Sequence, residues 1–184
     1  MRLTLLAHAE TEGTRDMVFG DGSARLRPGQ HAQPWRAGTQ CFCGPEPVCR
    51  QTAHLVGLTH AEVLDELAGP AFGSWAGQPL ADVMEEDPVG VTAWLGDPEV
   101  APHGGESLTA MAVRVGQTLD GYVWPERGGV IVVSPFVARA GLIHALGVSP
   151  SAILRAEVAP LGSVTISRHS AHWRLTGLDH PRSR

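Results

Sequence analysis

The apolar run at residues 129–133, GVIVV, constrains the fold more than any other feature of the chain. Consecutive β-branched residues without polar alternation are typical of a central strand that is covered on both faces of a sheet. This run leads through Ser134 into a helix expected over residues 136–147. Residues 2–7, RLTLLA, repeat the pattern with a short buried strand that ends at a polar turn containing His8. An α/β fold is therefore expected.

Strands and helices alternate along most of the chain. Further strands are expected at 39–43, near 62–67, at 156–166 and at 172–177, and helices at 45–56, 79–86, 88–96 and 107–122. This alternation favours a three-layer α/β/α sandwich, with a mostly parallel central sheet and an antiparallel edge. Ligands of such sheets bind at the carboxyl ends of the strands. His8, Gly44 and Ser134 each follow a strand end, so they are expected to converge.

Length and apolar content set the domain organisation. The chain has 184 residues, 43 % of them hydrophobic, which fits a single domain over residues 1–184 with a sizeable core. Residues 20–38 are rich in glycine, proline and arginine and are expected to form a loop. That loop is a candidate lid or specificity element over the cleft.

The charged residues exclude several functions. All 14 basic residues are arginine, and the net charge of −5 argues against a nucleic-acid binder with a basic face. The absence of lysine excludes a lysine Schiff base and a P-loop lysine. Any phosphate would have to be held by arginine, histidine or backbone amides.

Location and cofactors follow from segment lengths and the cysteines. The chain has no run of about 18 apolar residues that could span a membrane. The apolar N-terminal stretch is too short for a signal peptide, so we expect a cytoplasmic protein. Three cysteines argue against a disulfide framework in that compartment. Cys41 and Cys43 could face one side of a strand as metal ligands, but small buried hydrophobes are the expected reading. Neither a metal nor a cofactor is expected.

Five segments, taken together, resemble the signature sequences of the histidine phosphatase superfamily, which has the phosphoglycerate-mutase-like fold. They are LLAHAET at 5–11 (L-x-R-H-G-E-T), PEPVCRQTA at 45–53 (P-L-x-R-A-x-Q-T-A), FGSWAG at 72–77 (F-G-x-W-E-G), PHGGESL at 102–108 with Arg114-Val115 (P-x-G-G-E-S-L…R-V), and SPFVARAGLIHALG at 134–147 (S-H-x-x-V-I-R-A…A-L-G). Their order and spacing hold from residue 3 to about residue 176.

The resemblance implies a nucleophilic histidine at His8 that accepts a phosphoryl group, surrounded by two arginines, a second histidine and an acidic proton donor. The chain keeps His8 but has Ala7 and Val48 at the arginine positions, Gly69 at the acid and Pro135 at the second histidine. Removing a single electrostatic donor typically costs ~10²–10³ in rate. Little conventional phosphatase chemistry is therefore expected, and the fold alone does not assign a function.

The remaining candidates fall into two groups. Catalytic candidates are His8, as acid/base or nucleophile, with Glu10 and Glu106, and candidates for substrate contact are Thr11, Arg15, Arg50, His103, Ser134 and Arg139. Most have a structural alternative, because serine, threonine and glutamate also cap helices and loops, and surface arginine is commonly solvated. His103 is expected on an exposed loop that could still reach the cleft.

Three functions fit these residues. An enzyme is expected, repurposed for His8-centred acid/base chemistry of lyase, isomerase, cyclase or hydrolase type on a small metabolite. The first alternative is a residual phosphomonoester hydrolase that works through phospho-His8. The second is a catalytically inactive binding or scaffold protein. The expected partner is a small molecule, with neither nucleic acid nor membrane, and a homodimer is left open.

Overall fold

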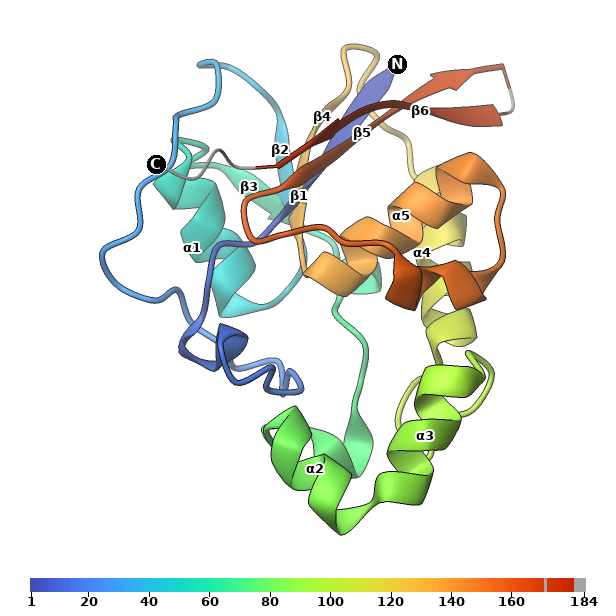
Figure 1. Cartoon of the computed structure of the whole chain (residues 1–184). Coiled ribbons are helices and arrows are strands. Elements are labelled where there is room, and N and C mark those ends of the chain that lie inside the picture. The colour runs from blue at the N-terminus through green and yellow to red at the C-terminus, as the bar shows by residue number, and fades with distance from the viewer. Residues whose placement is uncertain (171, 181–184) are drawn as a thin grey trace.

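A computed structural model describes residues 1–170 and 172–180, and in this part the strands form one six-stranded sheet with the order β3-β2-β4-β1-β5-β6 (Figure 1). The strands are β1 (Arg2–Ala7), β2 (Cys41–Cys43), β3 (Ala61–Val63), β4 (Gly129–Val133), β5 (Ser163–His169) and β6 (His172–Asp179). The helices are α1 (Pro47–Leu55), α2 (Leu80–Glu86), α3 (Pro88–Gly96), α4 (Leu108–Gly121) and α5 (Pro135–Leu146).

The pairing confirms the expected sheet. Strands β3, β2, β4 and β1 run parallel, and β5 and β6 form the antiparallel edge. The two most apolar strands, β1 and β4, are neighbours at the centre, where Leu5 lies opposite Ile131. Both faces of this pair are buried, which explains why these strands lack polar alternation.

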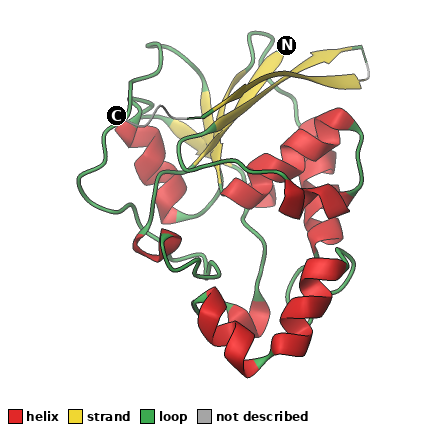
Figure 2. Ribbon diagram, in the orientation of Figure 1, coloured by secondary structure: helices red, strands yellow, loops and turns green. Residues whose placement is uncertain are grey.

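Helices cover both faces of the sheet, which makes the sandwich three-layered (Figure 2). One face, with Leu6 and Val132, packs in a core cluster with residues of α1. Alternate residues of the same strands, such as Leu5 and Val133, pack in a second cluster with residues of α4 and α5. Helix α5 lies very close to β1, because a Cβ placed on Gly141 would be 2.6 Å from the Leu5 side chain.

Helices α2 and α3 lie beyond one end of the sheet (Figure 1). They are tied to the rest of the molecule through an aromatic cluster, in which Phe19 packs against Phe72, Trp75 and Trp94 with ring centroids 4.9–5.7 Å apart. Phe136 of α5 extends the cluster, 5.6 Å from Phe72. Among the described residues, none of the helices is long and apolar enough to cross a bilayer.

Two expected strands were wrong in part. The strand expected at 156–166 begins only at Ser163, because the preceding chain crosses the end of β1, where Leu161 N donates to Ala7 O and Ala7 N donates to Gly162 O. The strand expected near 62–67 is limited to β3, and a 3-10 turn at Asp65–Leu67 follows it. Both errors arise because the bounds of a strand depend on its pairing with distant segments, which the local pattern of apolar residues does not indicate.

Candidate active site

The expected convergence of three strand ends is confirmed. Strands β1, β2 and β4 are parallel neighbours, so the residues after them meet at one edge of the sheet. His8 N donates to Val133 O at 2.8 Å, and Gly44 N donates to Val132 O at 2.9 Å. Ser134 follows β4 and begins α5, where its hydroxyl accepts from Val137 N at 3.3 Å, the expected N-cap.

The His8 imidazole is held in one tautomer. Its Nδ1 lies 2.8 Å from Ala9 O, an acceptor only, so Nδ1 carries the proton and Nε2 has a free lone pair. Burial lowers the pKa of His8, and the Ala9 carbonyl and the Glu46 carboxylate oppose that shift. The ring is therefore neutral at pH 7, as a general base or nucleophile requires.

The lowered pKa of His8 sets an expected pH dependence. In an NMR titration of the imidazole nitrogens, we expect His8 to titrate below the ordinary value of about 6.5. Because the unfolded chain then takes up this proton first, stability from neutral His8 is complete above about pH 6.5 and is lost as the pH falls through the native pKa. His8→Gln should reduce this loss in urea unfolding, and a His8 titration at or above 6.5 would contradict the assignment.

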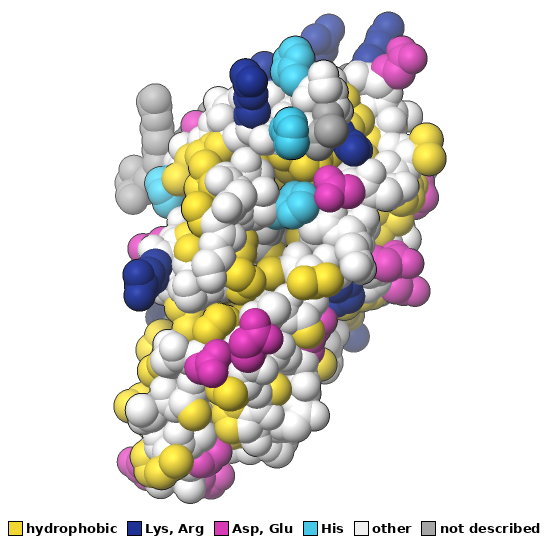
Figure 3. Space-filling model, turned by 90° about the vertical axis from the view of Figure 1, so that its right-hand side faces the viewer, with side chains coloured by type: hydrophobic (Ala, Val, Ile, Leu, Met, Phe, Trp, Pro, Cys, Tyr) yellow, Lys and Arg dark blue, Asp and Glu magenta, His cyan; other side chains and the backbone are white. Residues whose placement is uncertain are grey.

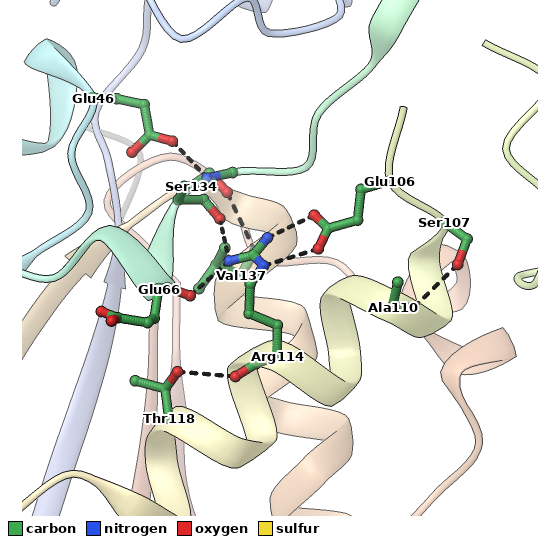
Figure 4. A network of polar contacts seen from close by, with 11 residues as sticks. Glu46, Glu66, Glu106, Ser107, Ala110, Arg114, Thr118, Ser134 and Val137 are labelled. Carbon is green, nitrogen blue, oxygen red and sulfur yellow. Dashed lines mark hydrogen bonds and ion pairs between the residues drawn. The ribbon is translucent and has the colours of Figure 1, made fainter. Parts of the chain in front are cut away.

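A carboxylate that sequence analysis missed, Glu46, lies at the same edge. Its Oε1 accepts from Gly69 N at 2.5 Å, and its Oε2 lies 3.6 Å from Cys49 Sγ. A Cβ on Gly69 would be 3.2 Å from Glu46 Oε1 and 3.4 Å from Ser134 Oγ, so both side chains border this glycine. Figure 4 labels Glu46 and Ser134. The Glu46 carboxylate also opposes the lowering of the pKa of His8 by burial.

The position of Glu46 carried a signal that was available in the sequence. It is the N-cap of α1, the helix that follows β2 at the carboxyl edge of the sheet. An acidic residue at the start of such a helix lies at the carboxyl edge of the sheet and is favoured there by the helix dipole. A Cβ on Gly44 would lie 2.7 Å from Glu46 Oε2, so the two nearby glycines, Gly44 and Gly69, make room for the carboxylate.

Glu106 forms a structural tie with Arg114 of α4. The guanidinium binds both carboxylate oxygens, at 2.8 and 2.6 Å, and its remaining nitrogen donates to Glu66 O and Ala68 O (Figure 4). Both carbonyls belong to the three residues before Gly69, so the Glu106–Arg114 pair positions the segment that donates to Glu46. Both carboxylate oxygens of Glu106 are therefore engaged by Arg114. A catalytic role for Glu106 stays a prediction.

Glu10 and Thr11 contact the loop at residues 20–38. The Glu10 carboxylate pairs with Arg27 at 2.7 Å, while Gln30 binds both the Glu10 N–H and its carbonyl. Thr11 is the N-cap of the 3-10 turn at Glu12–Thr14, where its N–H donates to Thr14 Oγ1 and the two hydroxyls are in contact. This is the capping role given above as its structural alternative. The expected loop is thus present and docked on the turn that follows His8.

The three candidate arginines form none of the ion pairs found in the described part of the chain. Arg15 and Arg50 are exposed. Arg139 lies over the Phe136 ring, 5.3 Å from its centroid, and its Nε is buried without a partner among the described residues. Burial lowers the pKa of Arg139, and the Glu157 carboxylate opposes that shift. Their roles in substrate contact stay predictions.

The expected exposure of His103 was wrong, because it is only 3 % exposed. Its ring packs against Trp75 and Phe72, with centroids 4.9 and 5.6 Å apart. Nδ1 accepts from Gly105 N at 3.0 Å, and burial lowers the pKa of the imidazole. The loop that contains Gly104 and Gly105, the glycine-rich loop, directs the His103 side chain into the aromatic cluster. The polarity of the residue alone does not predict this packing.

The cysteines behave as small hydrophobes. Cys41, Cys43 and Cys49 are free and buried between the sheet and α1, and burial raises the pKa of the Cys41 thiol to about 12. In the described part of the chain, no group of three or more potential metal ligands is assembled. Two cavities, of about 620 and 870 Å³, lie at the opposite edge of the sheet, beside Cys41 and Val130.

Histidine side chains also gather on the face that carries the β5–β6 hairpin (Figure 3). His169 and His172 are exposed there. The His144 ring of α5 fills the space beside Gly116, and its Nε2 lies 3.3 Å from Asp120 Oδ1. Asp120 accepts from Trp173 Nε1 at 2.8 Å, so this network joins α4, α5 and β6.

The sheet order and a tautomer-locked histidine at the end of the first strand define one class of protein. The chain belongs to the histidine phosphatase superfamily (branch 1), whose sequence pattern it matches over residues 3–180. The uncharacterised protein MT2287 and the bifunctional protein Rv2228c, both from Mycobacterium tuberculosis, are 28 % identical to it over 189 residues. These matches cover 92 % of this chain, which spans about half the length of either relative.

Solved structures agree on the fold. The alpha-ribazole phosphatase from Shigella flexneri is 22 % identical with a TM-score of 0.81, covering 98 % of this chain and 96 % of that one. The mycobacterial glucosyl-3-phosphoglycerate phosphatase Rv2419c is 22 % identical with a TM-score of 0.78, covering 95 % and 96 %. TTHB049 from Thermus thermophilus is 25 % identical with a TM-score of 0.77, covering 99 % and 100 %. The phosphoglycerate-mutase-like expectation is thereby confirmed for the fold.

Proposed function

We propose that this protein is an enzyme that moves protons on a small metabolite, with His8 as the base and Glu46 as the carboxylate that stabilises the protonated ring. The observation that carries the proposal is the hydrogen bond from His8 Nδ1 to Ala9 O, which leaves Nε2 unprotonated. His8 Nε2 takes a proton from the substrate, and Glu46 stabilises the imidazolium that forms. Lyase, isomerase, cyclase and hydrolase reactions all use such a pair.

The residues around His8 support proton transfer over phosphoryl transfer. Ala7 is fully buried and Val48 is 1 % exposed, so neither position offers a cation where the resembled family has arginine. Arg114, one guanidinium beside this edge, is occupied by Glu106 and two carbonyls. A phosphoryl group in transfer needs positive charge on its equatorial oxygens, and neither of the two positions where the family has arginine supplies it.

A residual phosphomonoesterase is the second candidate, favoured by the same hydrogen bond. A free Nε2 lone pair also suits a nucleophile that attacks phosphorus, which would form phospho-His8 and expel the alcohol. Two solved structures with this fold are named as phosphatases, one of alpha-ribazole and one of glucosyl-3-phosphoglycerate. In the third candidate, a binding or scaffold protein, the same cleft holds a small molecule without turnover.

One experiment separates these functions. The purified protein is incubated with a small-molecule extract, and metabolites are compared by mass spectrometry between wild type and His8→Ala. We expect a metabolite that wild type converts without releasing inorganic phosphate, with conversion reduced about 10²-fold or more in His8→Ala, because the base is removed. Glu46→Gln should also slow this conversion while circular dichroism stays unchanged.

The outcomes are distinct. His144→Ala removes a histidine outside the cleft and serves as the matched control, with conversion expected to stay at the wild-type rate. Release of inorganic phosphate that depends on His8, for example from p-nitrophenyl phosphate, would replace the proposal with the phosphomonoesterase. Retention of a small molecule by both wild type and His8→Ala, without conversion by either, would favour the binding protein.

A further inference from the structure

The larger of the two cavities at the amino ends of the parallel strands, of about 870 Å³, is lined by three arginines. Arg2 comes from the start of β1, while Arg36 and Arg127 come from the loops before β2 and β4. The carboxylate of Glu126 also lines the cavity, so cations outnumber anions three to one there, although the whole chain has a net charge of −5. Positive charge is therefore concentrated at this cavity.

The guanidinium groups of the three cavity arginines are available to a ligand. The ion pairs in the described part of the chain involve Arg27, Arg114 and His144, and none involves an arginine of the cavity. All three cavity arginines are exposed. Like charges gathered at one cavity repel one another, and a bound anion removes that repulsion.

Two hydrogen-bonded turns hold Arg36 and Arg127 at the cavity. Thr39 donates to Arg36 O from its N–H at 3.2 Å and from its hydroxyl at 2.7 Å. Gly128 N closes the turn that carries Arg127 by donating to the carbonyl three residues earlier, at 2.7 Å. Gly128 has φ +72°, and a Cβ there would lie 1.5 Å from Arg2 O, so this turn lies directly against the start of β1. The three cations are therefore presented by segments that are already ordered.

An indole ring contributes the aromatic part of the lining. Trp35 is half-buried and packs against the core cluster on the α1 face of the sheet. Its N–H donates to Val56 O at 2.8 Å, which ties the segment before Arg36 to the end of α1. Flat rings stack on such an indole. The volume lies within the range of about 300–1,000 Å³ that is usual for small-molecule sites, so an organic anion fits better than a single inorganic ion.

The cavity is remote from the candidate active site. Strand β1 begins at Arg2, and His8 follows its last residue, Ala7. At about 3.3 Å per residue, the two ends of this strand are about 20 Å apart. A ligand held by Arg2 therefore occupies a site of its own, separate from His8.

We infer that this cavity binds a nucleoside diphosphate or triphosphate, with its phosphates on Arg2, Arg36 and Arg127 and its base on Trp35. The inference goes beyond the proposed function, because it assigns a second ligand site at the other end of the sheet. Guanidinium groups bind phosphate oxygens through paired, charge-assisted hydrogen bonds. Several cations around one cavity suit a ligand with several negative charges, and the indole suits one that also carries a flat ring.

Isothermal titration calorimetry of the full chain with ADP at pH 7.5 tests the inference. We expect saturable binding of one ADP per chain, weakened about tenfold or more in Arg36→Gln and in Arg127→Gln, because each loses charge-assisted hydrogen bonds to phosphate. Adenosine, which keeps the ring without the charge, should bind about tenfold more weakly than ADP or worse. Arg155→Gln is the matched control, because it removes an exposed arginine that does not line the cavity.

His8→Ala should leave ADP binding unchanged, since His8 does not line the cavity. Loss of ADP binding in His8→Ala, with retention in both cavity variants, would place the ligand at the candidate active site and overturn the inference. Absence of saturable ADP binding to wild type, equal weakening in Arg155→Gln, or adenosine binding as tight as that of ADP would also overturn it. The proposed function is judged by His8-dependent conversion of a metabolite, so the two proposals can fail independently.

Discussion

Arg114→Met is expected to destabilise the protein by about 2–3 kcal/mol and to lower Tm by about 4–12 °C. Methionine keeps the apolar stem but removes the guanidinium that binds Glu106 and the carbonyls of Glu66 and Ala68. Glu106 is then left as a mostly buried carboxylate without its cation, with an exposed side-chain fraction of 19 %. Urea unfolding followed by circular dichroism measures the change.

Arg27→Met is the matched control for Arg114→Met, since it removes the same group from the more exposed pair with Glu10 and should cost only about 0–1 kcal/mol. The double variant of Arg114→Met with Glu106→Gln should recover part of the loss, because the unpaired charge is gone. Equal losses at Arg27 and Arg114 would show that Arg114 does not hold the segment before Gly69. The site would then depend on other contacts for the position of Glu46.

The architecture could be predicted from the sequence because its signals are local. The apolar runs of β1 and β4 require burial on both faces, and a serine caps both α4 and α5, so these elements were placed within a residue or two. The chain from Ala156 to Gly162 was misjudged because its apolar residues serve a crossing over the end of β1, where Leu161 donates to Ala7. Pairing between distant segments decides such cases.

The site was predictable in position but not in its charges. Parallel strand ends gave His8, Gly44 and Ser134 from pattern alone. Glu46 was not predicted, because the positions where the family has its second arginine and its acid are Val48 and Gly69 here. The fold brings the Glu46 carboxylate beside Gly69. The contact with Gly69 depends on a glycine 23 positions away, whose missing side chain leaves the space for Glu46. Such compensation between two positions appears only in three dimensions.

Gly73→Ala is expected to be the most destabilising single substitution considered, at about 3–5 kcal/mol. Gly73 has φ +48°, and a Cβ there would lie 2.0 Å from His103 O. The same carbonyl accepts from Ser74 N at 2.9 Å, and Glu106 N donates to Ala71 O at 2.8 Å, so two loops are joined at this point. The methyl group forces them apart, and a weaker near-ultraviolet circular dichroism of the tryptophans together with a lower urea midpoint should report it.

Gly104→Ala separates backbone strain from collision. Gly104 also has positive φ, +70°, but a Cβ there would meet nothing within 4 Å, so its cost should be about 1–2 kcal/mol. A similar cost at Gly73 would mean that the two loops can move apart without loss. Because Glu106 and Arg114 join these loops to the segment before Gly69, a collision at Gly73 should also disturb the His8 imidazole signals, whereas Gly104→Ala should leave them in place. The surroundings of His8 and the loop at Gly104 and Gly105 would then be shown to be structurally coupled.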